Sequence, residues 1–321
     1  MTAVCISHKE DVDGIVSASM LRHLFDAEPI LVDYTNFMPK LEVAAAKQDL
    51  KRLFVCDLGL SKASENRFVE ILGNLRRRGA DVTYIDHHDL SEEVKRNLKD
   101  KGINLIHAVE ECTSVLIYDR VGRDKLPKRF TLLAACAAIV DDMEDRPLAS
   151  RLLGMYDKQF VFFEATSLSY AIYGNQQRLD FLNSLVSELD GLMPHEIAGV
   201  LESAEGYAHK ISTNRAVVEK EAGRKKNLVY VQTADLSTSI VSNMLLASHQ
   251  DRQVAVAYKE KDNNIVLSIR GSDSCGEHLG RMVNKLSVEL GGSGGGHENA
   301  AGAMIPKQKL EEFLERVDSM L

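Results

Sequence analysis

Short apolar runs alternate with helical patterns over the first third of the chain. Five runs are apolar on both faces, as buried strands are: residues 3–7, 30–34, 53–56, 82–85 and 104–107. Helical spacing fills residues 15–25, 62–78 and 91–101 between them. Strands that alternate with helices predict βαβ units and a parallel sheet covered by helices on both faces.

The pattern becomes helical from about residue 112 to residue 222. The most apolar segment, 130–140, predicts a buried helix, and 148–163 and 177–189 continue the helical spacing. Pro194 suits the first turn of a long helix over 194–222. The later part of that helix is mostly polar, which predicts a helix that bridges two domains.

A second α/β pattern follows. It predicts strands at 228–231, 254–258 and 265–269 and helices at 238–248, 275–290 and 307–321. A glycine cluster at 291–296 interrupts this region. We therefore expect an α/β protein with a parallel-sheet domain over residues 1–150, a helical connector over 151–222 and a smaller α/β domain over 223–321.

Charge narrows the classes of partner. The chain of 321 residues has a net charge of −8, whereas proteins that hold duplex DNA by phosphate neutralisation alone are usually basic. Residues 207–321 carry 15 Lys and Arg against 14 Asp and Glu, so residues 1–206 carry a net charge of −9. Any contact with nucleic acid must be local, and the acidic first part suits a site that gathers cations.

The cysteines and the apolar runs bear on the compartment. Five cysteines are scattered without a CxxC pair, as buried free thiols are, which indicates a reducing compartment. The N-terminus shows no basic segment followed by a long apolar run, so we expect no signal peptide. The run at 130–140 is shorter than the roughly 20 residues that span a bilayer. We expect a cytoplasmic protein that makes no membrane contact.

Acidic and histidine residues follow three of the predicted strands and the most apolar helix. They are His8, Asp11 and Asp13, then Asp57, then Asp86, His87 and His88, and finally the pair Asp141 and Asp142. Ligands of open α/β sheets bind beyond the carboxyl ends of the strands, so three of these groups meet at one edge. Carboxylates and imidazoles suit divalent ions such as Mn²⁺.

Each of these groups also has a plain structural reading. Taken alone, Asp57 is most often a turn residue or a helix N-cap, and Asp141 or Asp142 could end a helix. One dinuclear metal site explains all the clusters together. Of the two helix-end acids, Asp141 is the preferred ligand because it directly follows the apolar Ala-Ile-Val run. In an extended segment, His87 and His88 point to opposite sides, so one can bind metal while the other faces substrate.

The order of these motifs resembles a known family. Asp86-His87-His88 is similar to the signature of the DHH phosphoesterase superfamily. The segment 11–14, Asp57 at its strand end and Asp141 match that family's other N-terminal motifs in the same order. Over nearly its whole length, the chain resembles the RecJ-like exonucleases and the nanoRNase-type phosphoesterases.

The resemblance implies two Mn²⁺ ions, with Mg²⁺ or another divalent ion as the alternative. The implied ligands are His8, Asp11 and Asp57 for one ion, and Asp13, Asp57, His87 and Asp141 for the other. The resemblance makes His88, Asp57 and Asp86 the catalytic set. His88 would face the substrate phosphate, and Asp86 would orient a ligand. One departure is the spacing of His8, which lies three residues before Asp11 where many relatives have four.

The second domain carries its own motif. Gly294, Gly295, Gly296 and His297 resemble the GGGH motif of the DHH-associated C-terminal domain, and a flexible linker is the alternative reading. Glycines let the backbone approach an anion, and a guanidinium such as that of Arg270 is a natural phosphate clamp. The resemblance therefore implies substrate binding by these residues, with the active site in the cleft between the domains.

The activity implied is that of a two-metal phosphodiesterase. We expect an exonuclease that acts on single-stranded DNA or RNA, or on short oligonucleotides, and releases nucleoside monophosphates. Alternatives within the same architecture are a cyclic dinucleotide phosphodiesterase and a 3′-phosphonucleotide phosphatase. A non-catalytic replication or repair scaffold is less favoured because the principal carboxylates and His87 are all present. A helicase or repair protein could dock on the polar connector, residues 177–224, and the chain could form a homo-oligomer.

Overall fold

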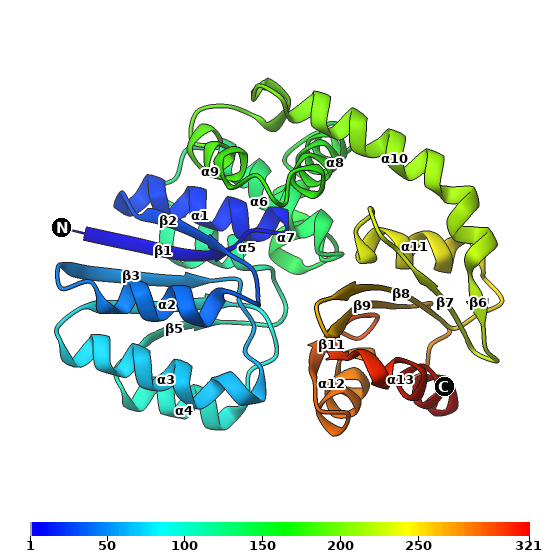
Figure 1. Ribbon diagram of the computed structural model, residues 1–321. Coiled ribbons are helices and arrows are strands. Elements are labelled where there is room, and N and C mark those ends of the chain that lie inside the picture. Colours follow the sequence, from blue (N-terminus) through cyan, green and yellow to red (C-terminus); the bar gives the residue numbers. More distant parts are fainter. Residues whose placement is uncertain (1) are drawn as a thin grey trace. The chain divides into compact units, whose positions relative to one another are not determined.

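The computed structural model describes residues 2–321, which divide into two compact units. The first unit ends at Tyr207 and the second begins at Ala208, so the boundary falls inside the long helix α10 (Val200–Glu221). Each unit has its own sheet, and the colours of Figure 1 follow the chain from one to the other. The predicted α/β class, with a parallel sheet first and a second sheet after it, is confirmed.

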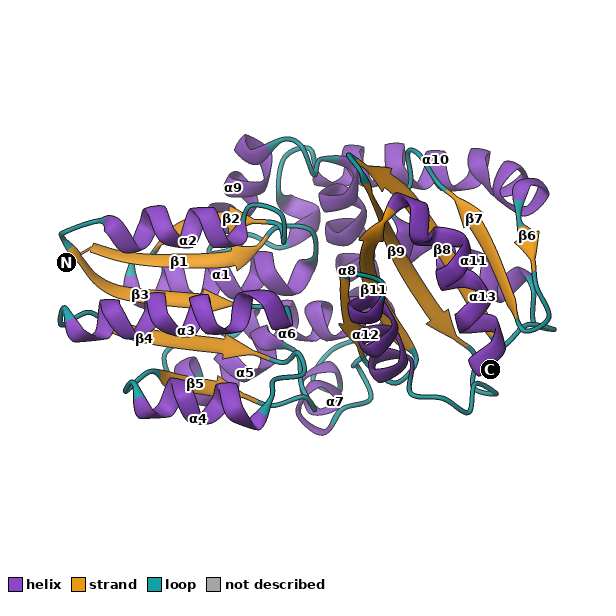
Figure 2. Ribbon diagram, turned by 60° about the horizontal axis from the view of Figure 1, so that its bottom comes forward, coloured by secondary structure: helices purple, strands orange, loops and turns teal. Residues whose placement is uncertain are grey.

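The sheet of the first unit is five-stranded and wholly parallel, in the order β2-β1-β3-β4-β5 (Figure 2). Its strands are β1 (Thr2–His8), β2 (Glu28–Val32), β3 (Leu50–Cys56), β4 (Asp81–Asp86) and β5 (Asn104–His107). The chain builds β2 on one side of β1 and then crosses to place β3 on the other side. The strand order therefore reverses between β1 and β3, which is where open α/β sheets bind ligands.

Helices cover both faces of this sheet because its strands are apolar on both sides. On one face, Val4 and Ile6 of β1 pack with residues of α2 (Phe37–Ala46), α3 (Lys62–Arg77) and α4 (Glu92–Asp100). On the other face, Cys5 packs with residues from the remaining helices of the unit. These include α1 (Val12–Phe25), α5 (Thr113–Ile117), α6 (Arg129–Val140), α7 (Pro147–Leu153), α8 (Lys158–Gly174) and α9 (Leu179–Glu188).

Three helical predictions of the first unit need correction. The helix α2 was not predicted, although Phe37, Leu41 and Ala44 lie buried at helical spacing. The single helix expected over 148–163 is two helices, and the Asp157 side chain caps the second, α8. The helix expected over 194–222 is interrupted: Pro194 opens a short 3₁₀ helix, η2 (Pro194–Glu196), and α10 starts only after Gly199. Gly199 has a φ of +83°, a left-handed conformation that a continuous helix does not allow.

The second unit is a six-stranded mixed sheet in the order β10-β11-β9-β8-β7-β6. Only β7 and β8 pair in parallel among its described strands. The strands are β6 (Gly223–Arg224), β7 (Leu228–Gln232), β8 (Val254–Lys261), β9 (Asn264–Gly271), β10 (Ser293–Gly296) and β11 (Ala300–Pro306). Helices α12 (Leu279–Glu289) and α13 (Leu310–Met320) share one apolar core with the sheet. Helix α11 (Thr238–Ser248) packs on β8 and β9 from the other face of the sheet, and its Ser242 hydroxyl forms a hydrogen bond with the Ser268 hydroxyl of β9.

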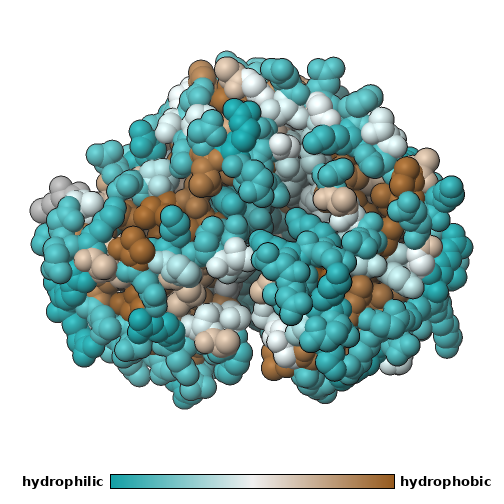
Figure 3. All heavy atoms as spheres, in the orientation of Figure 1, coloured by the Kyte–Doolittle hydropathy of each residue, from teal (hydrophilic) through white to brown (hydrophobic). Residues whose placement is uncertain are grey.

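Two predictions for the second unit also change. The glycine cluster does not interrupt the fold, because Ser293–Gly296 forms the edge strand β10 and pairs with β11. The helix expected from residue 275 begins at Leu279, where His278 provides the N-cap. The face drawn in Figure 3 is largely hydrophilic with smaller apolar areas. Within residues 2–321, no helix combines the length and apolar character needed to cross a membrane.

The aromatic cluster around Phe68 provides a test of the first unit's core. Phe68 is fully buried between the rings of Phe37 and Tyr84, at centroid distances of 5.9 and 5.0 Å. Phe68→Ala leaves a cavity and should lower the free energy of unfolding by about 3–5 kcal/mol in urea titrations followed by circular dichroism. Phe163→Ala, at a residue that is 48% exposed, should change it by less than about 1 kcal/mol. Equal effects would contradict this packing.

Candidate active site

The loop between β1 and α1 brings His8 and Asp11 together. Asp11 caps α1 by accepting a hydrogen bond from the Gly14 N–H at 3.0 Å, and its second oxygen lies 2.7 Å from His8 Nδ1. A Cβ on Gly14 would lie 2.2 Å from the His8 carbonyl oxygen, so only glycine allows this tight turn. The short spacing between His8 and Asp11 is thus compatible with direct contact between their side chains.

His8 and Asp11 shift each other's protonation. Burial opposes a charged imidazole, but the Asp11 carboxylate outweighs it and raises the pKa of His8 well above its usual range. Burial likewise opposes a charged Asp11, yet His8 and the Gly14 N–H hold the pKa of that carboxyl well below its usual range. Each of the two groups thus favours the charged form of the other.

Asp57 lies at the end of β3, where the strand order reverses. Its φ of +56° is a left-handed conformation that costs a non-glycine residue about 1–3 kcal/mol and that Asp tolerates better than most. Its side chain is 2% exposed, and its Oδ2 is buried without a hydrogen-bond partner among the described residues. Its Oδ1 lies 3.4 Å from His87 Nε2 and accepts a hydrogen bond of 3.4 Å from the Thr113 hydroxyl. The strained backbone thus directs a carboxylate into the group of His8 and Asp11, since its Oδ2 lies 3.8 Å from His8 Nδ1.

Asp13 is held by a helix that follows it by a hundred residues. Its two oxygens accept hydrogen bonds from the backbone N–H groups of Thr113 and Ser114, each at 2.7 Å, at the start of α5. The residue at the N-cap position of α5 is Cys112, which makes no side-chain capping bond. Asp13 therefore supplies the carboxylate that caps α5. The sequence interpretation, in which Thr113 or Ser114 itself caps this helix, left both residues outside the site, and no local pattern signals a cap that comes from a distant residue.

Asp86 positions His88. The Asp86 carboxylate is fully buried and accepts hydrogen bonds from Leu58 N–H, Tyr84 OH, and both the backbone N–H and the ring Nδ1 of His88. Burial opposes its charge, but His88 and these bonds hold the pKa of Asp86 below its usual value. The contact at Nδ1 fixes the orientation of the imidazole, so that Nε2 points away from Asp86. Tyr34 OH lies 3.5 Å from that Nε2.

His87 and His88 do not point to opposite sides as their adjacent positions predict, because their rings contact each other edge to face. Their rings are 4.5 Å apart with an interplanar angle of 74°. His87 is nearly buried, and its Nε2 lies 3.4 Å from Asp57 Oδ1 and 3.9 Å from Asp141 Oδ2. The His88 side chain is 29% exposed. One histidine therefore lies among carboxylates and the other toward solvent, where a substrate can reach it.

The end of α6 distinguishes the two neighbouring acids. Asp141 has a side chain that is 15% exposed, and it lies with Asp13 and Cys112 in one group of closely spaced polar atoms. Its Oδ2 is buried without a hydrogen-bond partner among the described residues. Asp142 is exposed and has a φ of +56°. Of the two acids, Asp141 is therefore the one placed among the other candidate ligands.

Residues 2–321 contain three groups of potential ligands, and the ligand atoms inside each group lie within 4.8 Å of one another: His8, Asp11 and Asp57; Asp57, His87 and His88; and Asp13, Cys112 and Asp141. Burial, followed by repulsion from Asp11 and Asp13, raises the pKa of Asp57 well above its usual range. Burial, with Asp13 as the next cause, does the same for Asp141. Such a concentration of carboxylates and imidazoles fits divalent cations, which would compensate the buried charge.

Cys112 is the exception in these groups. Burial, with the nearby Asp13 and Asp141 carboxylates as further causes, raises the pKa of its thiol well above the usual value. Its chemistry also differs from that of its neighbours, since thiolates select softer metals than carboxylates and imidazoles do. We assign Cys112 to the wall of the site. Among the residues that sequence reasoning missed, Tyr34 stands closest to His88, and its exposed position after β2 gave no signal beyond a strand end.

The second unit brings Arg270 beside the glycine-rich strand. Arg270 ends the core of β9 and pairs in register with Ala300 of β11, which follows the His297 turn. Its guanidinium donates to Ser239 Oγ at 2.6 Å and to Ser268 Oγ at 3.2 Å. Two serine hydroxyls therefore orient the cation. All five predicted substrate-binding residues, Arg270, Gly294, Gly295, Gly296 and His297, belong to this corner of the second unit.

The glycines of this motif serve packing as well as any ligand. Gly296 has a φ of +145°, and a Cβ there would lie 2.3 Å from the Ala300 carbonyl oxygen. A Cβ on Gly294 would lie 2.6 Å from Ser287 Oγ of α12. Gly295 is the open one, since its nearest neighbour would be Asn284 Nδ2 at 3.7 Å. Close approach of an anion is therefore easiest at Gly295.

Two family models match the chain. The N-terminal domain of the DHH family matches residues 2–139, and the DHHA1 domain matches residues 225–321. Among curated proteins, two uncharacterized proteins of Methanocaldococcus jannaschii are 31% identical over 97 residues and 45% identical over 56 residues. These stretches cover 30% and 17% of this chain and 22% and 17% of those proteins, so the matches span less than a quarter of the relatives.

Solved structures resemble the chain over nearly its whole length. The DHH domain of a member of the s1p family of ribosomal proteins has a TM-score of 0.68 at 14% identity. The match covers 98% of this chain and 85% of the chain of that structure. RecJ of Thermus thermophilus in complex with Mn²⁺ has a TM-score of 0.61 at 15% identity. The match covers 99% of this chain and 52% of the RecJ chain. The pGpG-specific phosphodiesterase PggH of Vibrio cholerae has a TM-score of 0.57 at 12% identity. The match covers 99% of this chain and 98% of the PggH chain. At these identities the likeness shows a shared fold.

Asp57 belongs to two of the three ligand groups, so it provides the sharpest test of metal binding. Asp57→Asn removes one buried charge and keeps a side chain that tolerates the left-handed backbone. We expect the wild-type chain to bind two Mn²⁺ ions, counted by electron paramagnetic resonance of free Mn²⁺. The variant should bind both ions at least about tenfold more weakly, because it loses a shared ligand.

The control is Asp145→Asn, at an exposed acid four residues after Asp141. It should bind Mn²⁺ as the wild type does. Calorimetry in EDTA should show the Asp57→Asn variant melting no lower than the wild type, because the substitution relieves repulsion. Unchanged Mn²⁺ binding in that folded variant would contradict the assigned centre.

Proposed function

The chain belongs to the DHH superfamily of phosphoesterases, with an N-terminal DHH domain and a C-terminal DHHA1 domain, and we propose that it is a two-metal exonuclease. Its substrates would be single-stranded DNA or RNA and short oligonucleotides, from which it releases nucleoside monophosphates. The observation that carries the proposal is the convergence of carboxylates and histidines from three strand ends on Asp57.

The residues proposed to hold the ions are the two sets that the family resemblance implies, and the contacts of Asp57 with His8 and His87 support them. His8, Asp11 and Asp57 form one set, and Asp13, Asp57, His87 and Asp141 form the other, with Asp57 shared. When bound, Mn²⁺ or another divalent ion would lower the pKa of the attacking water and offset negative charge on the phosphoryl oxygens. The hydrogen bonds from Gly14, Thr113 and Ser114 fix the carboxylates in place before any ion arrives.

His88 is the proposed proton-transfer residue. Its Nδ1 is held by Asp86, so Nε2 is the nitrogen that would face a phosphoryl or leaving oxygen. Tyr34 OH, 3.5 Å from Nε2, supplies a second polar group at the same place. Arg270, the amides of 294–296 and His297 would bind the rest of the substrate, since a guanidinium and backbone N–H groups both suit a phosphate. That both sets act on one substrate molecule, in a cleft between the domains, is part of the proposal.

Short substrates form the second candidate class. The pGpG-specific phosphodiesterase corresponds to this chain over 98% of its own length, whereas only 52% of RecJ does. This likeness over the length of that phosphodiesterase favours a linear dinucleotide as the second class of substrate. Cyclic dinucleotides and 3′-phosphonucleotides need the same chemistry and are the further alternatives. Docking of a helicase or repair protein on residues 177–224, and homo-oligomer formation, stay predictions.

The decisive experiment is hydrolysis of end-labelled 20-mers, as single-stranded DNA and RNA, with Mn²⁺. A linear dinucleotide, cyclic di-AMP and a 3′-phosphonucleotide run alongside, and Asp57→Asn is the inactive control. We expect stepwise shortening of the 20-mer with release of nucleoside monophosphates, lost in the variant. The position of the label that survives gives the polarity.

Each other outcome changes the assignment. Turnover of the linear dinucleotide alone would establish the second class of substrate. Turnover of the cyclic or 3′-phosphonucleotide substrate alone would establish one of the remaining alternatives. No Asp57-dependent turnover of any substrate would rule out the enzyme in favour of a binding scaffold.

Asp86→Asn tests the role of the residue that positions His88. The substitution keeps the size of the side chain but weakens its hold on the imidazole. We expect kcat to fall by roughly 10–100-fold, while the Mn²⁺ affinity and the KM change by less than about threefold. A fall in Mn²⁺ affinity equal to the fall in kcat would instead place Asp86 in the metal centre.

A further inference from the structure

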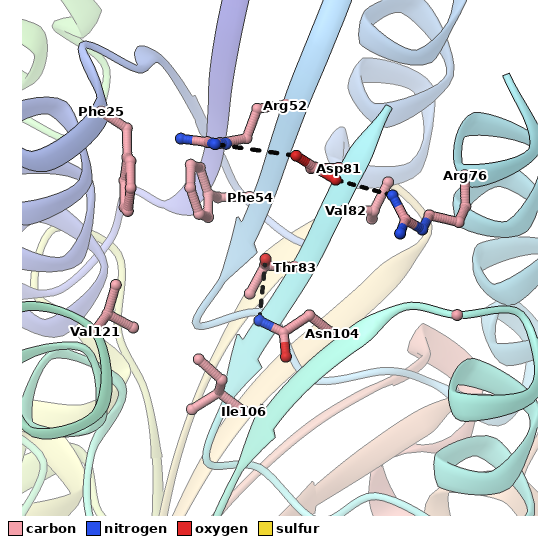
Figure 4. Close-up of a pocket in the computed structure, with 11 residues that line it drawn as sticks. Phe25, Arg52, Phe54, Arg76, Asp81, Val82, Thr83, Asn104, Ile106 and Val121 are labelled. Carbon is pink, nitrogen blue, oxygen red and sulfur yellow. Dashed lines mark hydrogen bonds and ion pairs between the residues drawn. The ribbon is translucent and has the colours of Figure 1, made fainter. Parts of the chain in front are cut away.

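A pocket of about 290 Å³ lies at the amino ends of β3, β4 and β5, away from the acidic centre (Figure 4). Arg52 of β3 borders it, and Asp57 follows that strand five residues later. At about 3.3 Å per residue, the two positions are separated by roughly 16 Å along the strand. The pocket is therefore a separate feature, at the amino ends of the strands, whereas the acidic centre lies at their carboxyl ends.

The register of the strands explains the lining of this pocket. Arg52 pairs with Asp81, and two residues further along, Phe54 pairs with Thr83, which in turn pairs with Asn104. Because side chains alternate along a strand, both rows face the same side of the sheet. Parallel sheets are normally apolar where helices cover them. Polar residues here imply that this part of the face is not built only for packing.

Stacked aromatic rings and aliphatic side chains form the apolar walls of the pocket. Phe25, the last residue of α1, stacks on Phe54 with centroids 4.9 Å apart and an interplanar angle of 27°. Figure 4 shows Phe25 and Val121 on one side of the pocket, with Thr83 and Ile106 across from them on the sheet. A planar molecule between Val121 and the sheet would contact aliphatic carbon of Val121, Thr83 and Ile106, beside the stacked rings of Phe25 and Phe54.

The charged end of the pocket favours an anion. Arg76 donates to Asp81 Oδ1 at 2.9 Å, whereas the Arg52 guanidinium approaches Asp81 Oδ2 only to 4.0 Å. Arg52 lies instead over the Phe25 ring, with Cζ 4.9 Å from the centroid, and donates no hydrogen bond within residues 2–321. Two guanidiniums and one carboxylate leave a net positive charge, and the N–H groups of Arg52 remain available to a ligand.

Asn104 adds recognition at the rim. Its Nδ2 donates to Thr83 Oγ1 at 3.4 Å, which orients an amide that is otherwise exposed. An oriented amide can both donate to and accept from the polar edge of a heteroaromatic ring. The pocket volume is near the lower limit of about 300–1,000 Å³ for small-molecule sites, so an oligonucleotide would not fit.

We propose that this pocket binds a nucleoside monophosphate or a ligand of the same chemistry, a planar heteroaromatic ring with one anionic group. The ring lies between Val121 and the sheet residues Thr83 and Ile106, beside the stacked rings of Phe25 and Phe54. Asn104 contacts its polar edge, and Arg52 binds the anion. This inference does not depend on the substrate of the proposed exonuclease, because it uses no residue of the candidate active site.

The test measures binding of AMP, GMP, CMP and UMP to the full-length chain by titration calorimetry in EDTA. At least one nucleotide should bind, and Arg52→Ala should weaken it about tenfold or more through loss of a charge-assisted hydrogen bond. The matched control is Arg67→Ala, an exposed arginine of α3 that pairs with Glu42 and Glu70 outside the pocket. It should bind within about twofold of the wild type.

A second variant tests the shape of the pocket without changing its charge. Val121→Phe fills the space for the ring and should also weaken binding about tenfold. The corresponding nucleoside and inorganic phosphate should each bind more weakly than the nucleotide, since each lacks one half of the contacts.

Three results would overturn the proposal. One is the absence of binding by any of the four nucleotides below about 1 mM. Another is an equal loss in Arg52→Ala and Arg67→Ala. The third is a loss in Arg270→Ala with none in Arg52→Ala, which would place the nucleotide in the candidate active site. None of these results depends on whether the chain hydrolyses oligonucleotides.

Discussion

The burial of several like-charged carboxylates in one place is the constraint around which the first unit is organised. Asp57 is almost completely enclosed, and repulsion from Asp11 and Asp13 adds to the effect of burial on its pKa. Burying unpaired charge is costly, so the fold must either neutralise it or offer it to a cation. Only part of the neutralisation comes from the chain, through the His8 imidazole and the N–H groups at the starts of α1 and α5.

The parallel sheet makes this concentration possible. The carboxyl ends of β1, β3 and β4 all lie at one edge, and the reversal of strand order between β1 and β3 leaves room there for side chains from both connections. Two local devices then direct the carboxylates inward. One is the glycine-dependent turn at Gly14, and the other is the left-handed backbone of Asp57. Both are costly for a generic loop, and both are explained by the site that they build.

The sequence was sufficient where a residue's position depends on its own strand. Asp57, Asp86, His87 and His88 follow apolar runs directly, so the sheet edge and the candidate ligands could be predicted together. The sequence was insufficient where the structure of one segment depends on a contact with a segment far away in the chain. The cap that Asp13 provides for α5 joins residues a hundred positions apart. Likewise, Gly199 interrupts the helix that was expected to start at Pro194. The glycine cluster forms a strand because β11 pairs with it.

The two edges of the parallel sheet carry opposite chemistry for a physical reason. At the carboxyl edge, helix starts and connections place carboxylates close together, and the resulting negative charge favours cations. At the amino ends of the strands, α1 ends at Phe25, which covers Phe54, and Thr83 and Asn104 line the pocket beside Arg52. A guanidinium held over an aromatic ring can retain its charge without a full ion pair, since the ring partly replaces its hydration. The same sheet can therefore hold cations at one edge and an anion at the other without the two ligands competing.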